Sequence, residues 1–230
     1  MCAQKKAKIT IVKNGPYFVT GNVPLAEKII SPKGKSYEYK EGKPIPQKEN
    51  CALCRCGHTK NRPFCDGAHQ RADFQGIETA SREPYIDRAE HFIGPELEVL
   101  DDHRCALGMF CHREPGSIWE LVSKSDIPEY KQEIIKSAAE CPAGRLVVRD
   151  KQGNIIEMQY EQEIEILQDI EKAVSGPLYV KGGIPLIAAD GYTYEIRNQM
   201  ALCRCGQSKN KPFCDAAHVV VKYRDDEGIR

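Results

Sequence analysis

The sequence lacks any hydrophobic run of membrane-spanning length, and the apolar stretch nearest its start, Ile9–Val12, covers only four residues. A secretory signal peptide needs a longer apolar segment, so we expect a soluble, cytoplasmic protein that does not insert into membranes. The sequence also lacks an excess of charge of one sign, because Lys plus Arg and Asp plus Glu both total 33. We therefore expect it to bind neither nucleic acid nor anionic membranes.

Two kinds of catalytic signature are missing as well. The sequence has no recognisable serine, histidine and acid arrangement and no glycine-rich phosphate-binding loop, so any catalysis would have to come from a bound cofactor. Aromatic residues are scarce at 7%, whereas charged residues reach 29%, which is a poor supply for one large core in a chain of 230 residues. The composition favours small modules, each stabilised by a bound metal centre.

Cysteine, by contrast, is abundant. The chain has eleven cysteines, and an odd number cannot pair completely in a disulfide framework. In a reducing compartment, clustered cysteines are more often metal ligands or redox centres than disulfide partners. We therefore interpret the clustered cysteines as candidate metal ligands.

An internal repeat contains most of these cysteines. Residues 52–69, ALCRCGHTKNRPFCDGAH, return at 201–218 as ALCRCGQSKNKPFCDAAH, with fourteen of eighteen positions identical. Upstream, NGPYFVTGNVPL at 14–25 resembles SGPLYVKGGIPL at 175–186. Each copy is predicted to form a strand, a loop, a second strand and then a cysteine-rich knuckle.

The repeat also tests which residues can be ligands, because a ligand of a shared site should occur in both copies. Cys51 lies opposite Met200 and His58 lies opposite Gln207, so neither pair fits this requirement. What both copies keep is the pattern Cys-x-Cys-x8-Cys-x3-His. Its members are Cys54, Cys56, Cys65 and His69 in the first copy and Cys203, Cys205, Cys214 and His218 in the second.

The spacing also predicts how the last two ligands of each copy meet. Cys65 and His69 are four residues apart, so we expect them to share one face of a helical turn. Asp66 and Asp215 are suited to accept hydrogen bonds from the free amides of that turn.

Three thiolates and one imidazole can bind either a tetrahedral zinc ion or a two-iron, two-sulfide cluster. The single residue between the first two cysteines is tighter than the usual zinc-knuckle spacing, and a two-iron cluster offers one metal atom to each ligand pair. The pattern therefore favours iron–sulfur chemistry. A structural zinc protein that binds partners is the alternative.

Both copies resemble the CDGSH iron-sulfur domain family, whose motif runs Cys-x-Cys-x2-Ser/Thr-x3-Pro-x-Cys-Asp-Gly-Ser/Ala/Thr-His. The resemblance implies one [2Fe-2S] cluster per motif, held by the four ligands of each copy, and β-rich modules. Single-motif members pair as homodimers, so a chain with two motifs is expected to be a monomer that forms the pair internally, as an intramolecular pseudo-dimer. One departure is Ala216 in place of Gly67, which costs about 1 kcal/mol or more if the position needs a positive φ.

Three further cysteines lie between the copies. Cys105 and Cys111 occupy the outer places of a ferredoxin-type knuckle whose central place is Gly108, and Cys141 is followed by Pro142. This pattern resembles the divergent single-cluster ferredoxin domain. It implies a third cluster, for which one iron per thiolate favours [3Fe-4S]. A [4Fe-4S] cluster would need a fourth ligand from His103, His112 or solvent, and the other alternative is that the cysteines are small buried hydrophobic residues.

The segments around these cysteines fit a ferredoxin-like βαββ module. Residues 96–101 alternate as a strand, residues 128–140 form a predicted helix with Pro128 near its start, and 152–154 are the turn of a predicted hairpin. The expected fold is therefore α+β with three modules. They cover residues 1–83 (first CDGSH-type module), 84–162 (ferredoxin-like module) and 163–230 (second CDGSH-type module).

Two stretches carry less information. Residues 70–92 are interpreted as a linker with little core, and the acidic residues of 161–172 are interpreted as a solvated face. The function that the cysteine patterns favour is electron transfer by a redox carrier rather than substrate conversion by an enzyme. The alternative is an iron–sulfur cluster store or donor. The expected partners are redox proteins in the first case and apo-protein cluster acceptors in the second.

Overall fold

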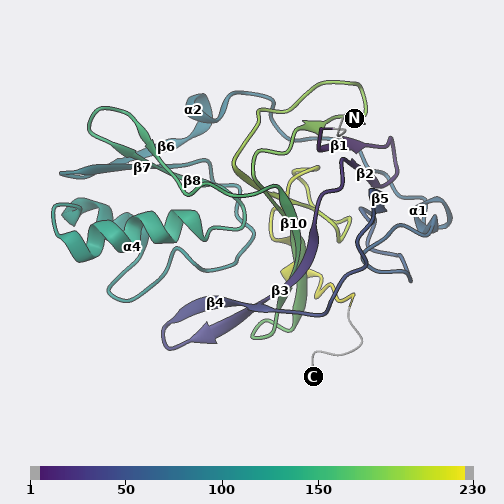
Figure 1. The fold of residues 1–230 in the computed structure, drawn as a ribbon, viewed down its shortest axis with the longest axis horizontal. Coiled ribbons are helices and arrows are strands. Elements are labelled where there is room, and N and C mark those ends of the chain that lie inside the picture. Colours follow the sequence, from purple (N-terminus) through teal and green to yellow (C-terminus); the bar gives the residue numbers. More distant parts are fainter. Residues whose placement is uncertain (1–5, 226–230) are drawn as a thin grey trace, which may run out of the picture.

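Strands dominate the fold, and most of the helices are a single turn long (Figure 1). The computed structural model describes residues 6–225, so the outer ends of the predicted first and last modules, residues 1–5 and 226–230, lie outside the described residues. Within the described range no helix combines the length and hydrophobicity needed to cross a membrane. The helices are α1 (Ala68–Arg71), α2 (Tyr85–Arg88), α3 (Ile118–Leu121), α4 (Pro128–Ala139) and α5 (Ala217–Val220), with a 3-10 turn η1 (Val122–Lys124).

The first of three sheets combines strands from both repeats. It consists, in order, of β12 (Leu186–Ile187), β1 (Lys8–Ile11), β2 (Tyr17–Thr20) and β5 (Asn50–Leu53). β1 pairs parallel with β12, which places Ile9 opposite Leu186, and antiparallel with β2. Side chains alternate between the two faces of a strand, and Ile9, Ile11, Tyr17 and Val19 all point into the core.

The second sheet is also shared between the repeats. Its order is β13 (Gln199–Leu202), β11 (Val174–Lys181), β10 (Glu163–Asp169), β3 (Leu25–Lys33) and β4 (Ser36–Glu41). β10 pairs parallel with β3 and antiparallel with β11, so a strand of the second half of the chain is hydrogen-bonded to a strand of the first.

The acidic segment 161–172 is not the solvated face that its composition suggests. Most of it is β10, at the centre of the second sheet and buried along nearly all of its length. Its carboxylates are paired within the protein, since Glu165 Oε1 lies 2.6 Å from Lys181 Nζ and Asp169 Oδ2 lies 2.7 Å from Lys172 Nζ. The interpretation as a solvated face is therefore wrong, because a buried charge is tolerated where a counter-charge is supplied.

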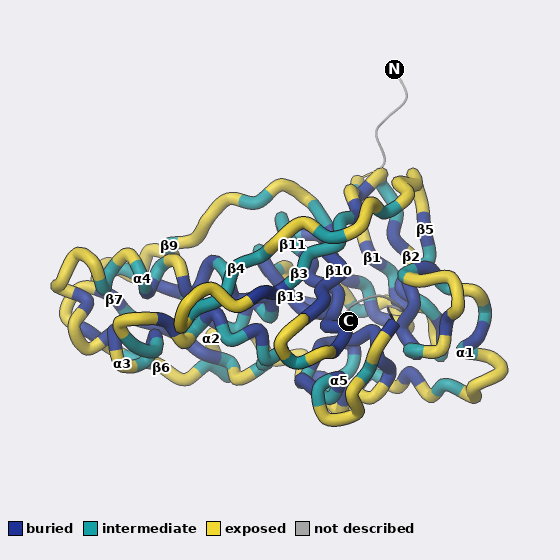
Figure 2. Tube along the Cα trace, turned by 90° about the horizontal axis from the view of Figure 1, so that it is seen from below, coloured by how far each residue is buried: buried dark blue, intermediate teal, exposed yellow. Residues whose placement is uncertain are grey.

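The two cysteine-rich knuckles contact each other through equivalent residues. A Cβ added to Gly57 would lie 2.6 Å from the carbonyl oxygen of Cys205, and one added to Gly206 would lie 2.5 Å from that of Cys56. The hydroxyl of Tyr17 donates to the carbonyl oxygen of Cys203 at 2.9 Å. Side chains of both repeats form one hydrophobic core, and Figure 2 shows buried trace around β10 and β13 near the centre of the molecule.

The third sheet lies at one end of the molecule, with α4 packed against it (Figure 1). Its order is β6 (Glu90–Ile93), β7 (Leu97–Asp101), β8 (Leu146–Asp150) and β9 (Ile155–Ile156), all antiparallel. The predicted strand at 96–101, helix at 128–140 and hairpin around 152–154 correspond to β7, α4 and β8–β9 and are confirmed. Leu97, Val99, Ile118, Ile134 and Val148 form the centre of a separate small core.

Residues 70–92 are more than the linker expected from their composition. They include α2 and most of β6, and the hydroxyl of buried Tyr85 donates to the carbonyl oxygens of Leu100 and Arg145 at 2.9 and 2.8 Å. The amide of Ala80 donates to the carbonyl oxygen of Lys211 in the second repeat at 2.9 Å. The segment is fixed by backbone hydrogen bonds and one aromatic anchor, neither of which an overall composition reveals.

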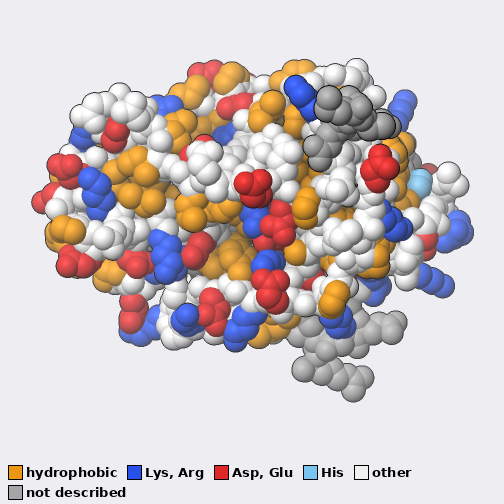
Figure 3. All heavy atoms as spheres, in the orientation of Figure 1, with side chains coloured by type: hydrophobic (Ala, Val, Ile, Leu, Met, Phe, Trp, Pro, Cys, Tyr) orange, Lys and Arg blue, Asp and Glu red, His pale blue; other side chains and the backbone are white. Residues whose placement is uncertain are grey.

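Basic and acidic side chains are interspersed on the face of the molecule that Figure 3 shows. This distribution agrees with the formal net charge of zero.

Candidate metal centres

The four predicted ligands of the first repeat form two close pairs. Cys54 Sγ lies 3.7 Å from Cys56 Sγ, and Cys65 Sγ lies 3.4 Å from His69 Nδ1. Two thiolates on one tetrahedral metal atom, with metal–sulfur bonds of about 2.3 Å, are about 3.8 Å apart, and a thiolate and an imidazole nitrogen are about 3.5 Å apart. Each pair is therefore spaced to share one metal atom, and the histidine presents Nδ1.

The second repeat has the same arrangement. Cys203 Sγ lies 3.7 Å from Cys205 Sγ, and Cys214 Sγ lies 3.4 Å from His218 Nδ1. Among residues 6–225 no group of three or more His, Cys, Asp or Glu side chains is arranged to hold a metal ion. The residues of each repeat thus fit a centre with two metal atoms, one for each pair, better than a single ion with four ligands.

Side-chain hydrogen bonds close the loop between the ligand pairs. Thr59 is buried, and its hydroxyl donates to the carbonyl oxygen of Phe64 at 2.6 Å. The carboxylate of Asp66 accepts from the amides of Lys60 and Ala68, both at 2.9 Å, as predicted for a residue that caps free amides. In the second repeat the equivalent bonds are made by Ser208 and Asp215.

The last ligand pair is brought together by a left-handed residue rather than by a helical turn. α1 begins at Ala68, after Cys65, so the prediction that Cys65 and His69 share a helical turn is wrong. Gly67 precedes the helix with φ 82° and its amide lies 3.5 Å from Cys65 Sγ. Ala216 holds the same position at φ 67°, so the strain expected from a Cβ there is present in the second repeat.

Within each cysteine pair, one thiol has a lowered pKa. The hydrogen bond from the Cys56 thiol outweighs burial and, with the amides of Thr59 and Gly57, lowers the pKa of Cys54 to about 6, whereas that of Cys56 is raised. The equivalent hydrogen bond from the Cys205 thiol lowers the pKa of Cys203 to about 7. The thiolate is the form that binds metal, so each pair offers one ligand near neutral pH.

The two repeats differ in how far their last ligand pair is buried. Cys65 and His69 are half-buried, whereas Cys214 and His218 are each 4% exposed. Burial, followed by the nearby charge of Arg204, lowers the pKa of His218 to about 4 and keeps the imidazole neutral, as a metal ligand must be. Cys214 belongs to a buried cluster with Ala106 and Ala201, so the segment between the repeats covers the second site.

The three remaining predicted ligands also lie near one another. Burial, followed by the charges of Cys141 and Cys105, raises the pKa of Cys111 to about 12, and burial raises that of Cys141 to about 11. Gly108 packs on Pro142, because a Cβ at Gly108 would lie 2.8 Å from Pro142 Cγ. The three thiols therefore lie within electrostatic reach of one another.

The loop that carries Cys105 is held in an unusual backbone conformation. His103, Leu107 and Met109 all have positive φ values, at 61°, 54° and 63°. Left-handed conformations cost non-glycine residues roughly 1–2 kcal/mol each and persist where the surroundings enforce them, as at functional sites. The carboxylate of Asp101 accepts from the amide of His103 at 2.9 Å.

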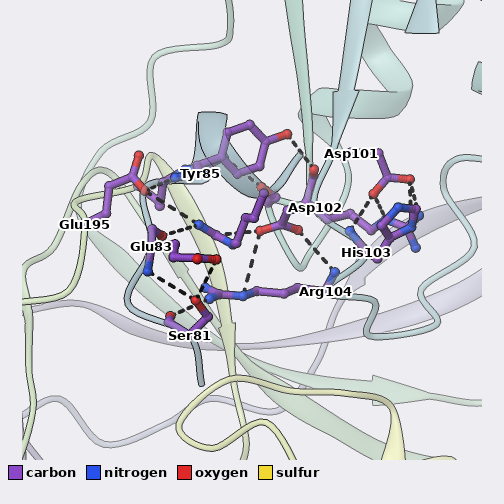
Figure 4. A network of polar contacts seen from close by, with 12 residues as sticks. Ser81, Glu83, Tyr85, Asp101, Asp102, His103, Arg104 and Glu195 are labelled. Carbon is purple, nitrogen blue, oxygen red and sulfur yellow. Dashed lines mark hydrogen bonds and ion pairs between the residues drawn. The ribbon is translucent and has the colours of Figure 1, made fainter. Parts of the chain in front are cut away.

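Figure 4 shows the polar network at the start of this loop, which includes Asp102 and Arg104. Arg88 pairs with Asp102 at 2.7 Å, and Arg104 donates to the carbonyl oxygen of Ser81 at 3.0 Å. The histidines considered as a fourth ligand have other contacts. His103 lies 3.2 Å from Glu90, and the ring of His112 lies 5.5 Å from that of Trp119.

Two residues of the sites were missed by the reasoning from sequence. Arg55 and Arg204, which stand between the paired cysteines of the two repeats, are only 1% and 2% exposed. The occurrence of arginine at this position in both copies was the signal that could have indicated a shared role. An arginine at the surface is the usual expectation, however, and only the structure reveals that these two are buried.

Comparison with known protein families finds one match, in two places. Residues 14–70 and 175–219 match the family described as iron-binding zinc finger, CDGSH type. These two ranges contain all eight residues of the two Cys3His sets, whereas residues 71–174 lie outside the match. The chain matches no curated protein and no solved structure.

Proposed function

Both repeats of this protein belong to the CDGSH-type iron-binding family, and from this premise we propose that each holds one [2Fe-2S] cluster and that the protein acts in electron transfer. When bound, such a cluster accepts and releases a single electron. The observation that carries the proposal is the arrangement of each Cys3His set as two pairs, at 3.7 and 3.4 Å, suited to two metal atoms. The proposed partners are redox proteins of a reducing compartment such as the cytoplasm.

The residues of each site have separate tasks. The paired cysteines and the third cysteine supply negative charge, and the neutral imidazole supplies a fourth donor without adding charge. Fewer negative ligands should raise the reduction potential above that of sites with four cysteines. Asp66 and Thr59 hold the loop, and the burial of Cys54 and Cys56 keeps water from one side of the site.

We propose further that the two repeats form an intramolecular pseudo-dimer and that the protein is a monomer. Matched contacts support this arrangement, since Gly57 abuts the Cys205 carbonyl and Gly206 abuts the Cys56 carbonyl. Equivalent residues contact each other in both directions, as in an interface between two identical subunits.

For the segment between the repeats, we propose a ferredoxin-like module with a third cluster on Cys105, Cys111 and Cys141. [3Fe-4S] is the favoured form, with [4Fe-4S] as the alternative. Support comes from the mutual influence of the three thiols, the strained loop and the order β7, α4, β8, β9. Cys105 is also among the charges that raise the pKa of Cys214, so this set lies within electrostatic reach of the second repeat.

Metal and sulfide analysis tests these proposals. Protein purified without oxygen should contain about seven irons and eight acid-labile sulfides per chain, and about four of each without a third cluster. Electron paramagnetic resonance should show reduced two-iron signals that return to the oxidised state with the iron retained. Colourless protein with stoichiometric zinc would contradict the cluster proposals and support a structural zinc protein.

A second candidate function, cluster donation to apo-proteins, is favoured by the exposure of one site. Cys65 and His69 are half-buried, whereas their equivalents in the second repeat are buried, so donation would start from the first repeat. Incubation with an apo-ferredoxin separates the two functions, because donation moves iron and sulfide together. If the protein is a donor, His69→Cys should slow that transfer and His218→Cys should leave its rate unchanged.

A further inference from the structure

A buried charge beside the first cysteine pair has no partner of opposite sign. Arg55 lies between Cys54 and Cys56 and is 1% exposed. Its Nη2 donates to the carbonyl oxygen of Gly76 at 2.6 Å, but its Nε and Nη1 have no hydrogen-bond partner. The rings of Tyr17 and Phe74 lie 5.6 and 5.7 Å from the guanidinium carbon. No carboxylate among residues 6–225 forms an ion pair with it.

The second repeat provides a matched comparison. Arg204 is 2% exposed, and its Nε and Nη2 donate to the carbonyl oxygens of Gly176 and Leu167 at 2.6 and 2.8 Å. Its Nη1 forms an ion pair with Asp225. The arginine between the paired cysteines thus has a carboxylate partner in the second repeat but, among the described residues, none in the first.

The difference arises at one position of the repeat. Gly76 and Asp225 each lie seven residues after the histidine ligand, and each donates its amide to a side chain at the start of the repeat. Gly76 donates to Asn14 Oδ1 at 3.0 Å and Asp225 to Ser175 Oγ at 2.9 Å. Because residue 76 is a glycine, the first repeat has no carboxylate at the position that Asp225 holds in the second.

The chain itself fixes Arg55 between two cysteines of the first repeat. Tyr17, whose ring faces the guanidinium, donates its hydroxyl to the carbonyl oxygen of Cys203 in the second repeat. Arg55, Cys203 and Cys205 all influence the pKa of Tyr17. The unpaired cation therefore lies where the cysteine sets of the two repeats face each other.

We infer that Arg55, a buried cation without a carboxylate partner within residues 6–225, favours the reduced state of the cluster sites, whereas the effect of Arg204 is reduced by its ion pair with Asp225. The inference rests on the proposed function. Three thiolates and a neutral imidazole leave each site anionic, and reduction adds one electron, taken from a one-electron donor protein, without making or breaking a bond. A fixed positive charge in a dry interior stabilises the added negative charge and thereby raises the reduction potential.

A redox titration of matched variants tests this role, with iron and sulfide counted first in each sample. Arg55→Gln should lower the midpoint potential of the two-iron signals at unchanged iron content. Arg55→Lys, which keeps the charge, should restore a potential close to that of the unaltered protein. Asp225→Asn, which frees the charge of Arg204, should raise the potential.

The results separate this inference from the function on which it rests. Samples with full clusters whose potential is the same in Arg55→Gln and Arg55→Lys would overturn the role of Arg55 and leave the electron-transfer proposal intact. Samples of the unaltered protein without iron and sulfide would overturn both. Should Arg55→Gln fail to retain its clusters, Arg55→Lys and Asp225→Asn still decide the question, because an unchanged potential in Asp225→Asn contradicts the electrostatic argument.

Discussion

The residue before each short helix differs between the repeats in a way that can be measured. Gly67 and Ala216 both have positive φ, and a Cβ at Gly67 would meet nothing within 4 Å, so only backbone strain separates the two side chains. Gly67→Ala should therefore destabilise the protein by about 1 kcal/mol, whereas Ala216→Gly should stabilise it by less, because the relief of strain is offset by the loss of a buried methyl group. Thermal unfolding of the metal-loaded protein measures both shifts. Shifts of the same sign would contradict the argument.

The exposure of the histidine ligands leads to a prediction about acid. Burial keeps His218 neutral down to a pKa of about 4, whereas an exposed imidazole is protonated near pH 6.5. Protons compete with metal for the ring nitrogen, so stability that depends on neutral His218 declines as pH falls from about 6.5 toward 4. The His69 side chain is half-buried and in contact with solvent, unlike that of His218. Cluster absorbance should then bleach in two phases, the first repeat preceding the second.

The variants of the two histidines assign these phases. His69→Cys should slow the early phase, because a thiolate replaces the imidazole that protons attack, and His218→Cys should affect only the late phase. Stopped-flow absorbance after a jump to acid pH measures the rates. An early phase that disappears in His218→Cys would show that burial does not control the order of loss.

At the scale of the elements, the contact between the knuckles depends on two glycines. Gly57 and Gly206 have φ values of 81° and 78°, and an added Cβ would lie 2.6 or 2.5 Å from a carbonyl oxygen of the other repeat. Substitution by alanine therefore adds a backbone clash to the conformational strain and should cost about 3 kcal/mol or more in either case. Gly153→Ala is the control, because Gly153 has φ 84° but open space around it. If thermal unfolding shows the same loss of stability in all three variants, the close contact between the knuckles is contradicted.

Elements whose residue pattern matches their burial could be predicted from the sequence. Features that depend on a contact with a residue distant in the sequence could not. α4 and the β8–β9 hairpin follow from periodicity and turn residues, and the Cys3His sets follow from the repeat. β10 was not recognised because its glutamates look solvated until Lys181, on the neighbouring strand, is seen to pair with Glu165. The difference between the two arginines could not be predicted either, because the sequence does not show that Asp225 forms an ion pair with Arg204 whereas Arg55 lacks a carboxylate partner in the part of the chain that the structure describes.

At the scale of the whole molecule, the shared sheets predict a monomer. Gly57 and Gly206 each abut a carbonyl group of the opposite repeat within this chain. Sedimentation equilibrium of the metal-loaded protein should therefore give a mass near 25.9 kDa at micromolar concentration. A mass of twice that value, independent of concentration, would indicate that the pairing between repeats is not complete within one chain.

The parallel pairing of β3 with β10 also constrains how the protein is made. Leu25 pairs with Ile164, so the second sheet stays incomplete until most of the chain has left the ribosome. Contacts of such large sequence separation form slowly, because a long loop must close first. The contact between the two knuckles cannot form before the C-terminal repeat has been synthesised. The proposed cluster sites therefore reach their full burial only in a chain whose translation is almost finished, and the cysteines of a nascent first repeat lack the second repeat that covers them.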